Sequence, residues 1–214
     1  MAADARGHDP RHWTVESAAT IRGFFAARSR HVVYFAGYGE LGYEQEERVR
    51  SVANDVLSNW TAASVLVHAG TLLRVGGHDG IAQVYSIART LGMETTGIYP
   101  SVAMSCGDTH RVSPCCDHVF FVEDVTWGGF LEATDVPSPT LRLHLDVSDE
   151  IVVIGGGKHA ADELRAFASF GKPVRYFPAE MNHTKTLEWS RVAGVRVTDL
   201  RGAAHAVWEQ LRAR

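Results

Sequence analysis

The sequence lacks several features that define common classes of protein. Its 214 residues contain three cysteines, an odd number that argues against a disulfide framework and fits a reducing compartment. No apolar run approaches the roughly 20 residues that a membrane-spanning helix needs, and the polar start of the chain does not read as a secretory leader. We therefore expect a cytoplasmic protein that makes no contact with a membrane.

Positive charge and familiar catalytic motifs are also scarce. The net charge is -4 and Lys and Arg form no dense run, so nucleic acid is not an expected partner. No Walker-type Gly-Lys-Ser/Thr and no Gly-x-Ser-x-Gly turn follows a predicted strand, which argues against an NTPase and against acyl transfer. The Gly-x-Gly-x-x-Gly spacing at Gly37, Gly39 and Gly42 has no helix directly after it, so hydride transfer is not favoured either.

Short apolar runs that alternate with amphipathic segments dominate what is present. The pattern predicts strands at 31–36, 64–68, 94–99, 149–154, 174–177 and 195–197, and helices at 14–28, 45–60, 81–91, 158–170, 185–192 and 200–212. Thr14 and Asp79 are the expected N-caps of two of these helices. The alternation predicts a single α/β domain over residues 14–214, with a Rossmann-like, mainly parallel sheet and helices on both faces, after an N-terminal tail of residues 1–13.

Residues 101–148 are long for a connection, and we treat them as an insertion that forms a lid or a dimer contact. Within it, 118–122 is a further candidate strand, and Trp127 to Phe130 either stack on a base or pack in a core or dimer seam. The insertion also holds potential zinc ligands, at Cys106, His110, Cys115, Cys116 and His118. Their spacing matches no recurrent zinc motif, so buried reduced thiols are the expected state and no metal is predicted.

Glycine-rich loops follow three of the predicted strands, after Ala36, His68 and Ile154. Because the carboxyl ends of parallel strands meet at one edge of a sheet, these loops should form one crevice. Glycines at a strand-to-helix turn expose backbone N–H groups, and the helix N-terminus favours an anion such as phosphate. The candidate ligand-binding residues are Gly37, Gly39, Gly76, Gly77, Gly80, Gly155, Gly156, Gly157, Lys158 and His159.

Two segments resemble motifs of the LOG family of cytokinin-activating proteins and of the broader SLOG group, often labelled lysine decarboxylase-like. They are Gly76-Gly77-His78-Asp79-Gly80-Ile81, which precedes a helix, and Gly155 to Glu163, which is similar to Pro-Gly-Gly-x-Gly-Thr-x-x-Glu; Asp149 to Val153 and Gly171 to Val174 agree in position. The resemblance implies a phosphoribohydrolase that removes a base from a nucleoside 5'-monophosphate. It also implies a homodimer and no cofactor, although other SLOG members bind nucleotide-derived ligands or carry molybdenum cofactor.

The resemblance assigns the chemistry of the ribose bond to Glu163, with Arg142 the residue nearest to the family's arginine, two positions away. The alternatives are a solvated helix acid at Glu163 and an ordinary surface arginine at Arg142. The sequence departs from the family where Gly155 replaces Pro and where His159-Ala160 replaces Gly-Thr. No lysine is placed to hold pyridoxal phosphate, so lysine decarboxylation is disfavoured.

The sequence thus predicts a nucleotide-directed N-glycosidase. The alternative is a non-catalytic sensor or carrier of a nucleotide, an ADP-ribose-like molecule or a pterin. His68, His78 and Asp79 also lie near the second loop, where a His-Asp pair for acid–base chemistry competes with a simple helix cap beside a loop histidine.

Overall fold

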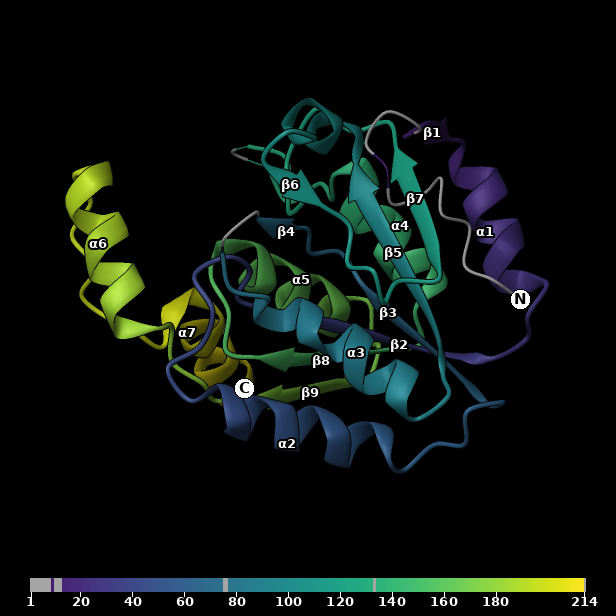
Figure 1. Ribbon diagram of the computed structural model, residues 1–214, viewed down its shortest axis with the longest axis horizontal. Coiled ribbons are helices and arrows are strands. Elements are labelled where there is room, and N and C mark those ends of the chain that lie inside the picture. The colour runs from purple at the N-terminus through teal and green to yellow at the C-terminus, as the bar shows by residue number, and fades with distance from the viewer. Residues whose placement is uncertain (1–8, 10–12, 75–76, 133, 214) are drawn as a thin grey trace.

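A seven-stranded, wholly parallel sheet forms the centre of the molecule in the computed structural model, which describes residues 9, 13–74, 77–132 and 134–213 (Figure 1). The strand order is β1-β7-β5-β3-β2-β8-β9. The strands are β1 (Val15–Glu16), β2 (His31–Gly37), β3 (Val65–Ala69), β5 (Glu94–Pro100), β7 (His118–Val122), β8 (Glu150–Ile154) and β9 (Val174–Phe177). Every neighbouring pair in this sheet is parallel, which confirms the predicted α/β, Rossmann-like fold.

Helices cover both faces of this sheet. They are α1 (Ala18–Ala26), α2 (Glu46–Leu57), α3 (Gln83–Thr90), α4 (Pro139–Val147), α5 (Lys158–Ser169), α6 (His183–Ala193) and α7 (Gly202–Arg212). Side chains of β2 alternate between the faces: Val33 and Phe35 pack with α2 and α3, whereas Tyr34 and Ala36 pack with α5. Among the described residues no helix is long and apolar enough to cross a membrane.

The order of the strands creates a switch point beside β2. The chain proceeds from β2 through β3 and β5 to β7 in one direction, and then returns to place β8 and β9 on the other side of β2. In open α/β sheets a crevice forms outside the carboxyl ends of the strands at such a reversal. The loops that follow β2, β3 and β8 therefore border one space, as the sequence predicts.

Much of the segment 101–132 and 134–148 is part of the central sheet and the helices that cover it. The candidate strand at 118–122 is confirmed as β7, which lies between β5 and β1. A short 3-10 helix, η4 (Ser101–Cys106), and an antiparallel pair, β4 (Leu73–Arg74) with β6 (His110–Arg111), precede it. Helix α4 then buries Leu141, Leu143 and Leu145 on the sheet. Most of the predicted insertion is thus the next strand and helix of the sheet, not a separate lid.

The N-terminal boundary differs from the prediction. Thr14 does not cap α1; the Ser17 side chain does, because its oxygen accepts a hydrogen bond from the Thr20 amide at 3.1 Å. Residues 15–16 instead extend the sheet as the edge strand β1, beside β7. Trp13, which we assigned to the tail, is 6% exposed and packs on Phe121 with ring centroids 4.6 Å apart.

Two further predicted features are wrong. Asp79 makes no capping hydrogen bond, because the helix there begins with a 3-10 turn, η3 (Gly80–Ala82). Residues 195–197 form no strand, because α6 ends at Gly194 in a left-handed conformation and the chain turns back toward α7, leaving Val195 49% exposed. A strand there would need a free sheet edge, and the segment pairs with none.

Candidate functional site

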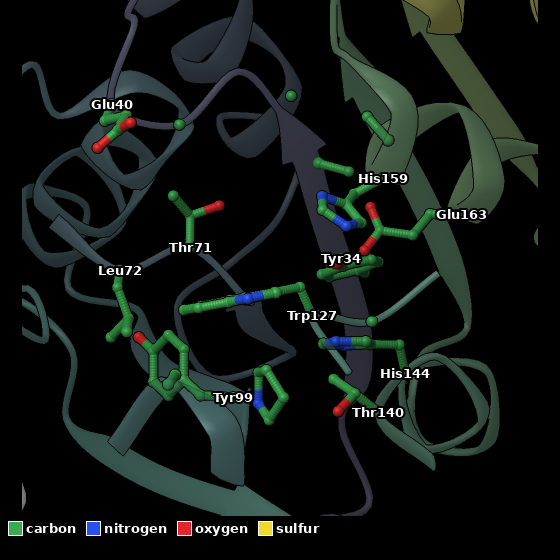
Figure 2. A pocket seen from close by; sticks show the side chains of 18 of the residues that line it. Tyr34, Glu40, Thr71, Leu72, Tyr99, Trp127, Thr140, His144, His159 and Glu163 are labelled. Carbon is green, nitrogen blue, oxygen red and sulfur yellow. Dashed lines mark hydrogen bonds between the residues drawn. The ribbon is translucent and has the colours of Figure 1, made fainter. Parts of the chain in front are cut away.

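A cavity of about 350 Å³, which we call the edge cavity, opens at the carboxyl edge of the sheet (Figure 2). It lies at the ends of β2 and β5 and is closed by the start of α5, by α4 and by the loop before α4. Its lining residues are Tyr34, Ala36, Gly37, Gly39, Glu40, Gly70, Thr71, Leu72, Tyr99, Pro100, Ala103, His110, Trp127, Gly128, Thr140, His144, His159, Ala160 and Glu163. None of these is Lys or Arg, so the lining combines acidic, histidine, hydroxyl, aromatic and small apolar side chains.

Glu163 projects from the second turn of α5 into the edge cavity. Its Oε1 accepts a hydrogen bond from the Tyr34 hydroxyl at 2.7 Å. Burial raises the pKa of Glu163 to about 7; the bond from Tyr34 opposes that rise and the nearby Asp162 charge adds to it. A carboxyl group that titrates near neutrality can both accept and return a proton, which general acid–base chemistry requires.

Tyr34 holds this carboxyl group in place. It is 2% exposed and stacks on His144 with ring centroids 4.5 Å apart and on His68 at 4.9 Å. Burial and the Glu163 charge raise the pKa of Tyr34 well above its ordinary value, so the hydroxyl remains a donor. Because the ring packs against both histidines, its hydroxyl fixes the direction in which Glu163 points (Figure 2).

Trp127 reaches the edge cavity on a loop that two carboxylates secure. Asp124 accepts hydrogen bonds from the Thr126 amide at 2.8 Å and from the Thr140 amide at 3.0 Å. Burial alone would raise the pKa of Asp124, but its hydrogen bonds with Thr140 and Thr126 outweigh it and lower the pKa. Asp162 on α5 lies against Gly129, where a Cβ atom would come within 2.7 Å of its Oδ2. This loop places the half-exposed Trp127 ring beside the cavity, as the prediction of a base-stacking residue requires.

The three-glycine turn after β8 is packed more tightly than the phosphate hypothesis assumes. The Gly155 amide donates to the Phe177 carbonyl oxygen at 2.9 Å. The Ala204 amide of α7 donates in turn to the Gly156 carbonyl oxygen at 3.1 Å. Gly155 and Gly156 are buried, and only Gly157 and the start of α5 remain accessible. The turn is therefore partly occupied by the protein's own C-terminal segment.

The other predicted ligand-binding residues lie at different distances from the edge cavity. Gly37, Gly39 and His159 line it, whereas Lys158 is exposed at the start of α5 and is not part of the lining. Gly76 lies outside the described residues. Gly77 borders a separate groove beside α6.

Gly80 has a structural reason of its own. Its φ is +52°, and a Cβ atom there would meet the backbone oxygens of Gly39 and Tyr38 at 2.1 and 2.3 Å. The glycine lets η3 dock on the loop that follows β2.

Burial lowers the pKa of His159 while the neighbouring Asp162 charge opposes that shift, so the imidazole at the cavity mouth tends to be neutral.

Arg142 does not reach the edge cavity. It pairs with Asp146 one helical turn later, at 2.9 Å, and its guanidinium lies over the Phe170 ring at 5.5 Å from the centroid. Its side chain is 54% exposed. The geometry is that of a surface arginine, the alternative that the sequence left open.

The possible zinc ligands do not converge. His118 pairs with Glu94 at 2.6 Å, and buried Cys116 donates to the His118 carbonyl oxygen at 3.2 Å. Among the described residues no group of three or more His, Cys, Asp or Glu side chains is arranged to hold a metal ion. His78 pairs with Glu46 at 2.8 Å, so the proposed His78–Asp79 acid–base pair is not formed.

Several lining residues escaped the sequence analysis, chiefly Tyr34, Glu40, Thr71, Tyr99 and His144. Tyr34 sits within an apolar strand, where a tyrosine reads as core. His144 sits among leucines, where a histidine gives no sign of facing a cavity. The only sequence signal at both positions is a polar side chain within an apolar segment. That signal indicates a cavity residue only once the side chains across the cavity are known.

No family model matches the chain, and no curated protein matches it. Among solved structures, the molybdenum cofactor carrier protein of Chlamydomonas reinhardtii is 17% identical, with a TM-score of 0.47, over 86% of this chain and 99% of that chain. A structural-genomics target designated TM1055 is 20% identical, with a TM-score of 0.46, over 67% of this chain and 72% of that chain. These likenesses concern the fold alone, and membership of the LOG or SLOG group stays a prediction.

Proposed function

We propose that the edge cavity binds a nucleoside 5'-monophosphate and that Glu163 assists cleavage of its N-glycosidic bond. The observation that supports this most is the position of Glu163 on the wall of the cavity, with a pKa raised to about 7 and a side chain held by Tyr34. A perturbed carboxyl group in a concave site at the switch point of a parallel sheet is a typical catalytic candidate.

The proposed reaction is a hydrolysis. The C1'–N bond breaks and its electron pair leaves with the base, while a water oxygen forms the new bond to C1'. Ionised Glu163 stabilises the positive charge that develops at C1' and takes the proton from the attacking water. The same proton then passes to the departing base, which restores the carboxylate and balances the reaction.

The walls of the edge cavity suggest how the ligand is oriented. The Trp127 ring offers a surface for the base, and Glu163 stands where the ribose would pass. The first amides of α5 have no intrahelical acceptor, and Gly157 provides no capping side chain, so the helix start near His159 is the place for the phosphate. The phosphate then lies at the cavity mouth instead of inside the Gly155–Gly156 turn.

A binding protein without turnover is the second candidate, and one observation favours it. Gly155 and Gly156, which match part of the family's phosphate motif, are buried, and the Gly155 amide already donates to the Phe177 carbonyl oxygen. A site with fewer free donors holds a transition state less firmly, although it can still bind and release a ligand.

Turnover and binding are separated by one pair of variants. Wild type and Glu163→Gln are incubated with AMP, CMP, GMP and UMP, and free base is measured by chromatography while binding is measured by calorimetry. We expect wild type to release base from at least one monophosphate, and Glu163→Gln to bind the same monophosphate but release at least about 100-fold less, as for loss of a general base. Glu188→Gln, at an exposed carboxylate on α6, is the matched control and should behave as wild type.

Binding of a monophosphate without any release of base would exclude the enzyme and leave the binding protein. Equal turnover in wild type and Glu163→Gln would show that another group carries the reaction. Absence of binding by all four monophosphates would contradict both candidates.

A further inference from the structure

Two buried histidines form a chain of hydrogen bonds that ends at the edge cavity. His68 on β3 is fully buried, and its Nδ1 lies 3.1 Å from the Thr96 carbonyl oxygen. Its Nε2 lies 2.6 Å from Nδ1 of His144, which is 2% exposed on α4. The His144 ring lines the edge cavity beneath Tyr34 (Figure 2).

This geometry determines where the protons sit. A carbonyl oxygen only accepts, so the His68 Nδ1 carries the hydrogen and donates it to Thr96. In a neutral imidazole the other nitrogen is then bare, so the His68 Nε2 is an acceptor. The His144 Nδ1 must therefore be the donor in the bond between the two rings, which leaves the His144 Nε2 without a proton.

We propose that His144 presents this bare Nε2 to the edge cavity as an acceptor for a hydroxyl or amino group of the ligand. The inference rests on the proposed function for the identity of the ligand, but the proton arrangement does not. The His144 Nε2 has no hydrogen-bond partner among the described residues. Gly70 adjoins it closely: a Cβ atom at position 70 would come within 3.2 Å of that nitrogen.

The surroundings keep both rings neutral. Burial lowers the pKa of His68 to about 3, and burial together with His68 lowers the pKa of His144 well below its ordinary value. The ionisable groups that face His144 are His68 and Tyr34, and Glu163 is reached only through the Tyr34 hydroxyl. The proton arrangement should therefore persist across neutral pH.

The consequence is a site that selects hydrogen-bond donors. The edge cavity offers the His144 Nε2 and the carboxylates of Glu40 and Glu163, and the described lining contains no Lys or Arg. Acceptors of this kind favour the hydroxyls of a ribose or the amino group of adenine or cytosine. A ligand that places a carbonyl oxygen at the same position sets its lone pairs against those of the acceptor, so its binding is disfavoured. His144 is thus a specificity-determining residue and His68 a positioning residue.

The proton arrangement is tested first, without any ligand. Long-range ¹H–¹⁵N correlation spectra of ¹⁵N-histidine-labelled protein distinguish a bare ring nitrogen from a protonated one. We expect a proton on Nδ1 and a bare Nε2 in both His68 and His144 around neutral pH. A proton on the His144 Nε2, or an imidazolium at either ring, would overturn the proposal whether or not the protein binds nucleotides.

Selection of donors is tested with analogues of AMP that lack single donors. The probes are AMP, 2'-deoxy-AMP, 3'-deoxy-AMP and purine riboside 5'-monophosphate, and their affinities are compared by calorimetry in wild type, His68→Leu and His68→Gln. We expect one deletion to weaken binding to wild type by about tenfold, the worth of one hydrogen bond. His68→Leu removes the acceptor that orients His144 and should erase that preference, whereas His68→Gln keeps an acceptor oxygen and should restore it.

Equal binding of all analogues by wild type, or an unchanged preference in His68→Leu, would refute donor selection by His144. If none of the four probes binds, the proposed function fails instead, and the ligand-free spectra alone decide the proton arrangement. Should His68→Leu not fold, the preference of wild type among the four probes and the ligand-free spectra of wild type still decide whether His144 acts as an acceptor.

Discussion

At the scale of single residues, Glu163 links the proposed chemistry to stability. Its side chain is only partly covered, yet burial of the carboxyl group raises its pKa from 4.5 to about 7. At low pH Glu163 is protonated in both the folded and the unfolded state, so its burial does not lower the free energy of unfolding there. As the pH rises from about 4.5 to 7, residue 163 ionises first in the unfolded chain, so the contribution of Glu163 to the free energy of unfolding falls across this window.

This contribution gives a prediction. Relative to Glu163→Gln, whose side chain stays neutral, wild type should lose on the order of 3 kcal/mol of stability between pH 4.5 and pH 7. Urea unfolding of both proteins as a function of pH measures the difference, with Glu188→Gln as the control. If Glu163→Gln and wild type show parallel pH profiles, the carboxyl group is not perturbed.

Two glycines provide a second test at the same scale. Ala at position 80 would have to adopt a φ of +52° and overlap the Gly39 carbonyl oxygen, so Gly80→Ala should destabilise the fold by at least about 2 kcal/mol. Gly23 lies within α1 with open space around it, so Gly23→Ala should stabilise by about 0.5–1 kcal/mol. Chemical denaturation measures both values; a harmless Gly80→Ala would contradict the docking of η3 described above.

At the scale of elements, the loop from Asp124 to Phe130 joins β7 to the edge cavity. Asp124 uses one oxygen for the Thr126 amide and hydroxyl and the other for the Thr140 amide. Asparagine cannot accept at both positions, so Asp124→Asn leaves one buried donor unpaired. The loop that carries Trp127 then loses its attachment to α4.

We expect Asp124→Asn to increase amide hydrogen exchange in residues 125–130 while the strands of the sheet keep their protection. Affinity for any ligand that stacks on Trp127 should fall in parallel. Asp135→Asn, at an exposed carboxylate between Phe130 and α4, is the control. Unchanged exchange in the variant would mean that Asp124 does not secure the loop.

The sequence predicts some elements well and others poorly for identifiable reasons. Strand β8 and helix α5 were predicted because a continuous apolar run meets three glycines, a local signal. Helix α4 was missed because Leu141, Leu143 and Leu145 alternate as in a strand. The helix buries six of its nine residues, and its polar stripe is reduced to Arg142 and Asp146.

The same distinction holds for the site. Glu163 was found because a glycine turn precedes it in sequence. Tyr34 and His144 were not, because their role depends on contacts between residues more than 100 positions apart, such as the bond from Tyr34 to Glu163. The occupied Gly155–Gly156 turn was also unpredictable, since the C-terminal residues that fill it carry no local mark of that contact.

At the scale of the whole molecule, α6 projects from the body of the domain (Figure 1). Its apolar residues Leu187, Trp189 and Val192 are 56%, 43% and 90% exposed, and Trp189 and Val192 border one groove. Exposed apolar side chains on a projecting helix favour an association surface. The homodimer implied by the family resemblance remains a prediction, and this helix is the natural place to test it.

Sedimentation velocity should report a dimer for wild type. The double variant Trp189→Ser/Val192→Ser should shift the protein toward the monomer, because it removes apolar area from the association surface. Val125→Ser, at an 86% exposed position on another loop, is the control. A monomeric wild type would contradict the prediction, and a dimer that survives the double variant would place the interface elsewhere.

The account as a whole depends on the edge cavity receiving a nucleotide with its ribose against Glu163. The most direct measurement is a crystal structure of Glu163→Gln soaked with AMP and with CMP, since this variant should bind without turnover. The account predicts density in the edge cavity, with the base beside Trp127, C1' next to residue 163 and the phosphate at the start of α5. A nucleotide bound elsewhere, or one whose C1' lies out of reach of residue 163, would contradict it.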